Sequence, residues 1–172
     1  MACYRSFELD ISSFERYLSD FKTTLYAVVS IVTPSSVASQ KAVLASCYKE
    51  NLTWEPDRKL RFLVEESKIQ DELATLMIRL RSRRTFMIDE AIGHVGFTPL
   101  KKLLDDTTDD HEGIGIYHII DIDGNLSSEI LSFAYKFSEP LEEEDLIIIS
   151  SSNEDEDENG NEDGDGDEDD DD

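Results

Sequence analysis

The side chains best suited to chemistry are few in this sequence, and their spacing matches no catalytic or metal-binding pattern. None of the histidines, His94, His111 and His118, has a cysteine or histidine partner at ligand spacing. Cys3 and Cys47 form neither a metal motif nor a secreted disulfide framework. There is no phosphate-binding loop and no nucleophile elbow. We therefore expect a protein that is not an enzyme and holds no metal or cofactor.

One short stretch, Asp121-Ile122-Asp123-Gly124-Asn125, superficially fits a calcium loop. The calcium-binding helix–loop–helix needs an acid at loop position 1 and a bidentate glutamate at position 12. With Gly124 aligned to the loop glycine, Ile119 and Ile130 occupy those two positions, and Glu129 falls one residue short. The stretch instead predicts a turn between two strands.

The C-terminal end is almost purely acidic and dominates the charge of the chain. From Glu154 to Asp172, 14 of 19 residues are Asp or Glu, and they supply −14 of the formal net charge of −24. The segment begins with Glu154, Asp155, Glu156, Asp157 and Glu158. Such composition predicts disorder. Nucleic acid is a poor direct partner, because that affinity comes from Lys and Arg. Basic proteins such as histones or ribosomal proteins fit better, unless the segment only maintains solubility.

An apolar quartet lies just before the acidic segment. It consists of Leu146, Ile147, Ile148 and Ile149. Three of the four are β-branched, which favours an extended strand. A quartet followed by serines and acidic residues resembles a SUMO-interacting motif, and that resemblance implies strand addition to a sheet edge of SUMO. Ser151 and Ser152 each precede an acidic residue by three positions, which makes them candidate phosphorylation sites. The alternative is that the quartet is the buried last strand of the domain.

The elements that would position these residues are predicted to be mainly helical. A heptad seam with alternating spacings of four and three is formed by Phe14, Leu18, Phe21, Leu25, Val28 and Val32. It predicts a helix over residues 13–32, which ends before Pro34. Further helices are expected over residues 36–50, 57–84, 86–95 and 99–106. This seam and a similar heptad face over residues 57–84 predict a helical hairpin or bundle, or an oligomer held together through the seams.

The third expected helix ends in a basic cluster of Arg79, Arg81, Arg83 and Arg84. Basic side chains at a helix C-terminus complement the helix dipole and solvate the surface, which is the interpretation we favour. Two alternatives stay open. The cluster could contact nucleic acid, or the acidic segment could cover it as an internal mask, in which case the contact would be salt-sensitive.

The pattern changes after residue 112, where apolar residues alternate with others. Residues 114–122 and 131–137 each show a period of two, which predicts two strands joined by the Asp123-Gly124-Asn125 turn. Two strands alone are marginal in water, so a third strand is expected. The quartet and residues 1–9 are the two candidates for it.

These observations together predict an α+β fold: a bundle of three to five helices followed by a C-terminal β-hairpin. Residues 1–149 would form one globular domain, and residues 150–172 a disordered acidic tail. The expected function is a non-enzymatic nuclear assembly protein that docks SUMO through the quartet and packs with a partner through its helices. An acidic chaperone of a basic protein is the alternative. No apolar run is long enough to span a bilayer, so no membrane partner is expected. The expected location is the nucleus or cytoplasm, with the nucleus favoured.

Overall fold

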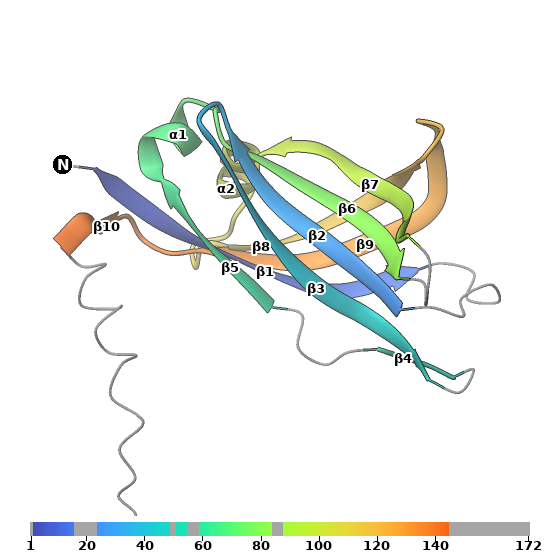
Figure 1. Cartoon of the computed structure of the whole chain (residues 1–172). Helices are drawn as coiled ribbons and strands as arrows, with labels where there is room; N and C mark the ends of the chain where they lie inside the picture. The colour runs from blue at the N-terminus through green and yellow to red at the C-terminus, as the bar shows by residue number, and fades with distance from the viewer. Residues whose placement is uncertain (1, 16–23, 49–50, 55–58, 84–87, 145–172) are drawn as a thin grey trace, which may run out of the picture.

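The computed structural model describes residues 2–15, 24–48, 51–54, 59–83 and 88–144. Within these residues the chain is mainly antiparallel β-sheet (Figure 1). The strands are β1 (Cys3–Glu15), β2 (Thr24–Thr33), β3 (Ser36–Tyr48), β4 (Asn51–Trp54), β5 (Lys59–Glu65), β6 (Thr75–Arg83), β7 (Glu90–Pro99), β8 (Glu112–Asp121), β9 (Leu126–Phe137) and β10 (Leu141–Glu142). The described helices are short: α1 (Glu66–Gln70) and α2 (Leu100–Asp105).

The strands run in the order β10-β1-β9-β8-β7-β6-β2-β3-β4, with β5 on the other edge of β1. The pairing between β7 and β8 is only two residues long, Gly93 with Asp121 and His94 with Ile120. The sheet therefore folds over at this point into two facing layers (Figure 1). On the opposite side, the Gln40 side chain of β3 donates to the Arg61 carbonyl of β5, 2.5 Å away, so the two layers approach each other there as well.

The core lies between the layers and follows the two-residue period of the strands. It includes Phe7, Leu9 and Ile11 from β1; Ala27, Val29 and Ile31 from β2; Leu76, Ile78 and Leu80 from β6; and Phe133, Tyr135 and Phe137 from β9. The Tyr135 hydroxyl donates to the Leu103 carbonyl at 3.0 Å, which ties α2 to the core. Gly115 of β8 lies under the Phe133 ring, where a Cβ atom would come within 2.5 Å. A larger residue there would displace the ring.

The helical bundle predicted from the sequence is wrong. Residues 36–50 fall largely in β3, and residues 57–84 divide into β5, α1 and β6. Residues 86–95 include the first part of β7 rather than a helix. The continuous apolar run of β2 explains part of the error. Seven consecutive residues of this strand are buried, because one face contributes to the core and side chains of neighbouring strands cover the other.

The predicted heptad seam is therefore not a coiled-coil surface. Phe14 belongs to β1, whereas Leu25, Val28 and Val32 belong to β2. Phe14 and Leu25 are core residues, but Val28 lies on the outer face of its layer. Leu18 and Phe21 are outside the described residues. A period of two, rather than 3.5, decides which of these side chains share a face.

Several predictions for the C-terminal half of the described chain are confirmed. The β8–β9 hairpin is confirmed, with Ile114 opposite Ala134 and Ile116 opposite Ser132. Its turn is closed by the Asp121 carboxylate, which accepts the backbone N–H groups of Asp123 and Asn125 at 3.0 and 2.9 Å. Residues 99–106 contain the predicted short helix, α2. β1 pairs with β9 and is the third strand that the hairpin needs.

Candidate functional site

The basic cluster of the sequence lies on β6 and not at a helix end, so its interpretation as a helix-dipole complement is wrong. In a strand, residues two apart project from the same face. Arg79, Arg81 and Arg83 therefore all point outward, while Leu80 and Ser82 between them are buried. Arg84, the fourth member of the cluster, is outside the described residues. A helix would have placed Arg81 on the opposite side from Arg79 and Arg83, whereas the strand collects all three on one surface.

Strand pairing adds further cationic residues to this surface. Val28 of β2 lies between Lys41 of β3 and Arg79 of β6, and Arg79 has His94 of β7 on its other side. Only 8% of Val28 is exposed, although it is on the outer face of the layer. Long Lys and Arg side chains can cover an apolar residue with their stems while their charges stay in water. We call the surface formed by Lys41, Arg79, Arg81 and Arg83 around Tyr26 the basic face.

Tyr26 is the centre of the basic face. Its ring is contacted by the Lys41 ammonium, 5.3 Å from the ring centroid, and by the Arg83 guanidinium, 5.6 Å away. Both cations lie within the range of a cation–π interaction. Only 3% of Tyr26 is exposed. The ring therefore holds two cations close together, although their like charges repel each other.

The Tyr26 hydroxyl is fixed by residues next to β7. It donates a hydrogen bond to the Asp89 carboxylate. Arg81 donates to the Asp89 backbone carbonyl at 3.3 Å. Burial raises the pKa of Tyr26 above its ordinary value, and the hydrogen bond to Asp89 raises it further, outweighing the opposite influence of Arg81. The hydroxyl therefore remains a neutral donor, and its partner Asp89 supplies negative charge beside the cations.

The cations of the basic face have no carboxylate partner among the described residues. The ion pairs between described residues involve other basic side chains: Arg5, Lys59, Arg61, Lys101, His111 and Lys136. Lys41, Arg79 and Arg83 are exposed, and Arg81 is half-buried. The surface therefore combines concentrated positive charge with accessible donors. Guanidinium groups bind phosphate oxygens in a bidentate geometry, so the arrangement suits a phosphorylated anion.

The outer face of the other layer is built differently. There a cross-strand row of alternating charge runs from Arg61 of β5 through Glu8 of β1 and Lys136 of β9 to Glu112 of β8. Arg61 pairs with Glu8, and Lys136 lies 3.3 Å from Glu112. We call this row the paired face. Partial burial would raise the pKa of Glu8, but the hydrogen bonds from Arg61 and Lys59 outweigh it and lower that pKa.

A shallow cleft of about 670 Å³ lies over the paired face. Glu8, Asp10, Glu112 and Lys136 are among its lining residues. Because its cations already have carboxylate partners, the cleft has less capacity for an added anion than the basic face. The described residues contain no group of three or more His, Cys, Asp or Glu side chains arranged to hold a metal ion.

The other residues singled out from the sequence are not brought together by the structure. The quartet Leu146–Ile149, the serines Ser151 and Ser152 and the acidic segment from Glu154 onward all lie outside the described residues. His111 contacts Glu139 at 2.8 Å, and His118 contacts the Ser127 carbonyl at 3.1 Å, which are structural contacts far apart on the sheet. The signal that could have identified the basic face was Arg-Leu-Arg-Ser-Arg at residues 79–83, whose period of two predicts a strand.

Comparisons with known proteins identify the fold. No protein-family model matches the sequence, and no curated protein matches it. A structure of CC2D1B, which coordinates ESCRT-III activity during the mitotic reformation of the nuclear envelope, has a TM-score of 0.54 at 18% identity and covers 76% of this chain and 54% of that one. Human GIVD cytosolic phospholipase A2 scores 0.54 at 12% identity, covering 81% and 18% of the two chains. The C2A domain of plant extended synaptotagmin 1 scores 0.54 at 9% identity, covering 83% and 97%.

These likenesses define an all-β antiparallel fold of the C2-domain type. The chain spans about half of the CC2D1B chain and under a fifth of the phospholipase chain, but nearly all of the C2A domain. The resemblance to the phospholipase therefore concerns a minor part of that enzyme and brings no catalytic activity to this chain.

The fold overturns the function predicted from the sequence. The prediction of a nuclear assembly protein that packs through a helical domain is wrong, because the described residues form an all-β fold of the C2 type. The alternative of an acidic chaperone rested on the charge of the acidic segment, which is outside the described residues, and the C2-type fold does not support it. The expectation of no membrane partner rested on the absence of a spanning apolar run, and the C2-type fold contradicts it. No helix in the described part of the chain is long and apolar enough to cross a membrane.

Proposed function

We propose that the basic face binds the phosphorylated headgroups of anionic membrane lipids, and that the chain is a non-catalytic membrane-targeting module. The observation that carries this proposal is the convergence of Lys41, Arg79, Arg81 and Arg83 on one side of a C2-type fold, without carboxylate partners among the described residues. The charge of this surface is therefore opposite in sign to the net charge of the chain, which is −24.

The size of the basic face favours a headgroup over a nucleic acid. Proteins that bind duplex DNA tightly commonly neutralise about 6–10 phosphates, more than four side chains can reach. A membrane contacts one face of the domain only, and charges more than about 8 Å from the contact are largely screened at physiological salt. The acidic remainder of the domain is therefore compatible with docking to an anionic surface. Such a module would act at the cytoplasmic surface of a membrane rather than in the nucleus.

The test is co-sedimentation of the full chain with phosphatidylcholine vesicles, with and without a polyphosphoinositide. The test variant carries Arg79→Ala, Arg81→Ala and Arg83→Ala. The matched control carries Lys59→Ala, Arg61→Ala and Lys136→Ala, which removes the same charge from the outer face of the other layer. Each basic residue near an anionic surface contributes about 1 kcal/mol, so the test variant should lose about a hundredfold in affinity. The control should bind within about twofold of the wild type.

Two results would overturn the proposal. One is an equal loss in both triple variants, which would show attraction to total charge and not to the basic face. The other is no binding of the folded wild type to any anionic vesicle. Binding to single-stranded RNA in place of vesicles, lost in the test variant alone, would assign the basic face to nucleic acid. Circular dichroism of each variant establishes that it is folded.

A further inference from the structure

We propose that the acidic segment Glu154–Asp172 docks on the basic face of the same chain and competes there with lipid headgroups. The inference deepens the function proposed above, because it names a regulator of the same surface. It joins two observations: a segment with 14 carboxylates among 19 residues, and a surface whose cations have no carboxylate partner among the described residues. Phosphate groups and carboxylates use the same guanidinium donors, so the two ligands exclude each other.

The length of chain that follows the described residues allows the acidic segment to contact the basic face. The described chain ends at Glu144, just after β10 (Leu141–Glu142) pairs with the start of β1. Another 28 residues follow, and at about 3.4 Å per residue they reach at most about 95 Å. The longest strands have 13 residues and are roughly 43 Å long. The acidic segment can therefore reach every face of the domain.

Among the surfaces that the acidic segment can reach, the charge distribution favours the basic face. Elsewhere among the described residues, several basic side chains already have carboxylate partners: Arg5 pairs with Glu66, Arg61 with Glu8, and Lys136 with Glu112. A carboxylate of the segment would have to displace a carboxylate of the domain at those positions. At the basic face it meets four gathered cations, whose mutual repulsion it relieves. The docking depends on charge rather than on a particular order of residues.

Tethering sets the expected strength of the competition. A segment on the same chain acts at an effective concentration on the order of millimolar, and its weak contacts are screened by salt. It should therefore mask the basic face partially, and its removal should raise the affinity for vesicles by roughly two- to tenfold. The masking should fade as ionic strength increases.

The first experiment detects the contact without any lipid. Full-length protein is compared with a full-length variant in which all Asp and Glu residues of Glu154–Asp172 are replaced by Asn and Gln. The Nε–H resonances of Arg79, Arg81 and Arg83 should shift between the two proteins, whereas that of Arg61 should not. A synthetic peptide of residues 154–172 added to the neutral-tail variant should restore the wild-type positions. Unchanged resonances on the basic face would overturn the proposal.

The second experiment measures the competition on polyphosphoinositide vesicles. The neutral-tail variant should bind roughly two- to tenfold more tightly than the wild type. In the Arg79→Ala, Arg81→Ala, Arg83→Ala background the same tail change should have no such effect. An equal gain in both backgrounds would show long-range repulsion of the tail from the vesicle and would refute docking. If the resonances shift but no protein binds vesicles, the headgroup function fails while the tail contact stands.

Discussion

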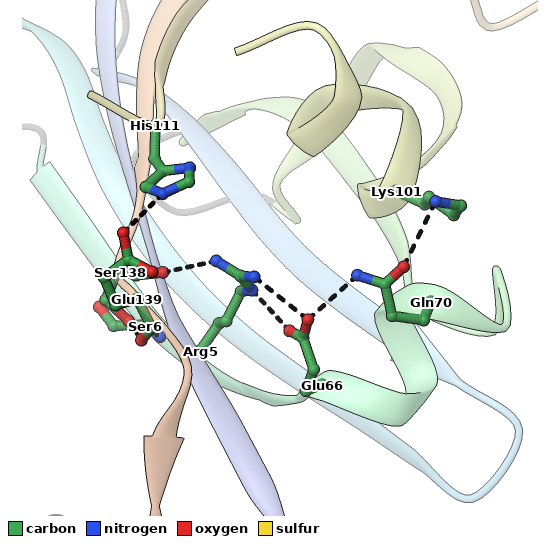
Figure 2. Close-up of polar contacts among 8 residues, drawn as sticks. All are labelled: Arg5, Ser6, Glu66, Gln70, Lys101, His111, Ser138 and Glu139. Atoms are coloured by element: carbon green, nitrogen blue, oxygen red, sulfur yellow. Dashed lines mark hydrogen bonds and ion pairs between the residues drawn. The ribbon is translucent and has the colours of Figure 1, made fainter. Parts of the chain in front are cut away.

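Arg5 and the arginines of the basic face use the same side chain in opposite ways. Arg5 lies at the end of the sandwich near the helices, where its Nε donates to one Glu66 oxygen at 2.5 Å and its Nη2 to the other at 3.2 Å (Figure 2). Its Nη1 donates to the Ser138 carbonyl at 2.9 Å. Arg79 has no ion-pair partner in the described part of the chain and is exposed. The Arg5 guanidinium therefore makes contacts within the fold, whereas the Arg79 guanidinium remains available to a ligand.

Burial explains the difference. Only 10% of the Arg5 side chain is exposed, so its charge must be neutralised within the protein. The surrounding contacts extend this network, since Gln70 donates to Glu66 at 3.0 Å and Lys101 to Gln70 at 3.4 Å (Figure 2). On the basic face, water solvates the charged ends and no such requirement exists. Like charges left together there cost repulsion, and that repulsion is released when an anion binds.

The largest effect is expected from Arg5→Met. The substitution leaves the Glu66 carboxylate half-buried without its partner and should lower the free energy of unfolding by about 3 kcal/mol. Urea denaturation measures this loss. The same change at Arg61, whose side chain is 67% exposed, should cost at most about 0.5 kcal/mol. Vesicle binding of folded Arg5→Met protein should be unaltered. Equal stability losses at Arg5 and Arg61 would remove the distinction between the two kinds of arginine.

Tyr26→Phe should have the next largest effect. It removes the hydroxyl that donates to the Asp89 carboxylate and leaves the ring between Lys41 and Arg83 in place. A hydrogen bond to a charged group contributes roughly 1.5 kcal/mol, so thermal unfolding should show a loss of about that size. If stability is unchanged while vesicle affinity collapses, the hydroxyl would be a headgroup contact rather than a support of the basic face.

Arg79→Met should change binding and leave folding intact. An exposed arginine without an ion-pair partner contributes little to stability, so the free energy of unfolding should stay within about 0.5 kcal/mol. Affinity for polyphosphoinositide vesicles should fall about fivefold, equivalent to about 1 kcal/mol. Isothermal titration and urea denaturation of the same preparation check both values. A loss of stability comparable to that of Arg5→Met would show that Arg79 is structural.

The smallest effect is expected in the acid range and concerns Glu66. Burial would raise its pKa, but hydrogen bonds from Arg5 and Gln70 outweigh it and lower the pKa below that of an unfolded glutamate. Its contribution to stability is therefore complete above that value and is lost as the pH falls through the depressed pKa. Glu66→Gln should be less stable than wild type at neutral pH, with a difference that shrinks towards acid. A constant difference across this pH range would contradict the linkage.

Local sequence correctly predicted those elements whose residue pattern fits only one kind of secondary structure. The β8–β9 hairpin has strict alternation and an Asp-Gly turn, and α2 follows a Thr-Pro start, so both were predictable. β2 was not, because both of its faces are covered and its apolar residues fit a helix seam as well as a strand. The ion pair between Arg5 and Glu66 was not predictable from local sequence either, because the two residues lie 61 positions apart.

The sequence by itself determined the net charge of −24, the acidic segment, the hairpin and its turn, since these depend on composition or on residues a few positions apart. Only the tertiary structure decided that β3, β2 and β6 lie side by side. Strand pairing over long sequence separations depends on which apolar faces close on one another, and no local pattern records that choice. The same pairing gathered Lys41, Tyr26 and three alternate arginines into one surface. The candidate site therefore exists only in the folded sheet.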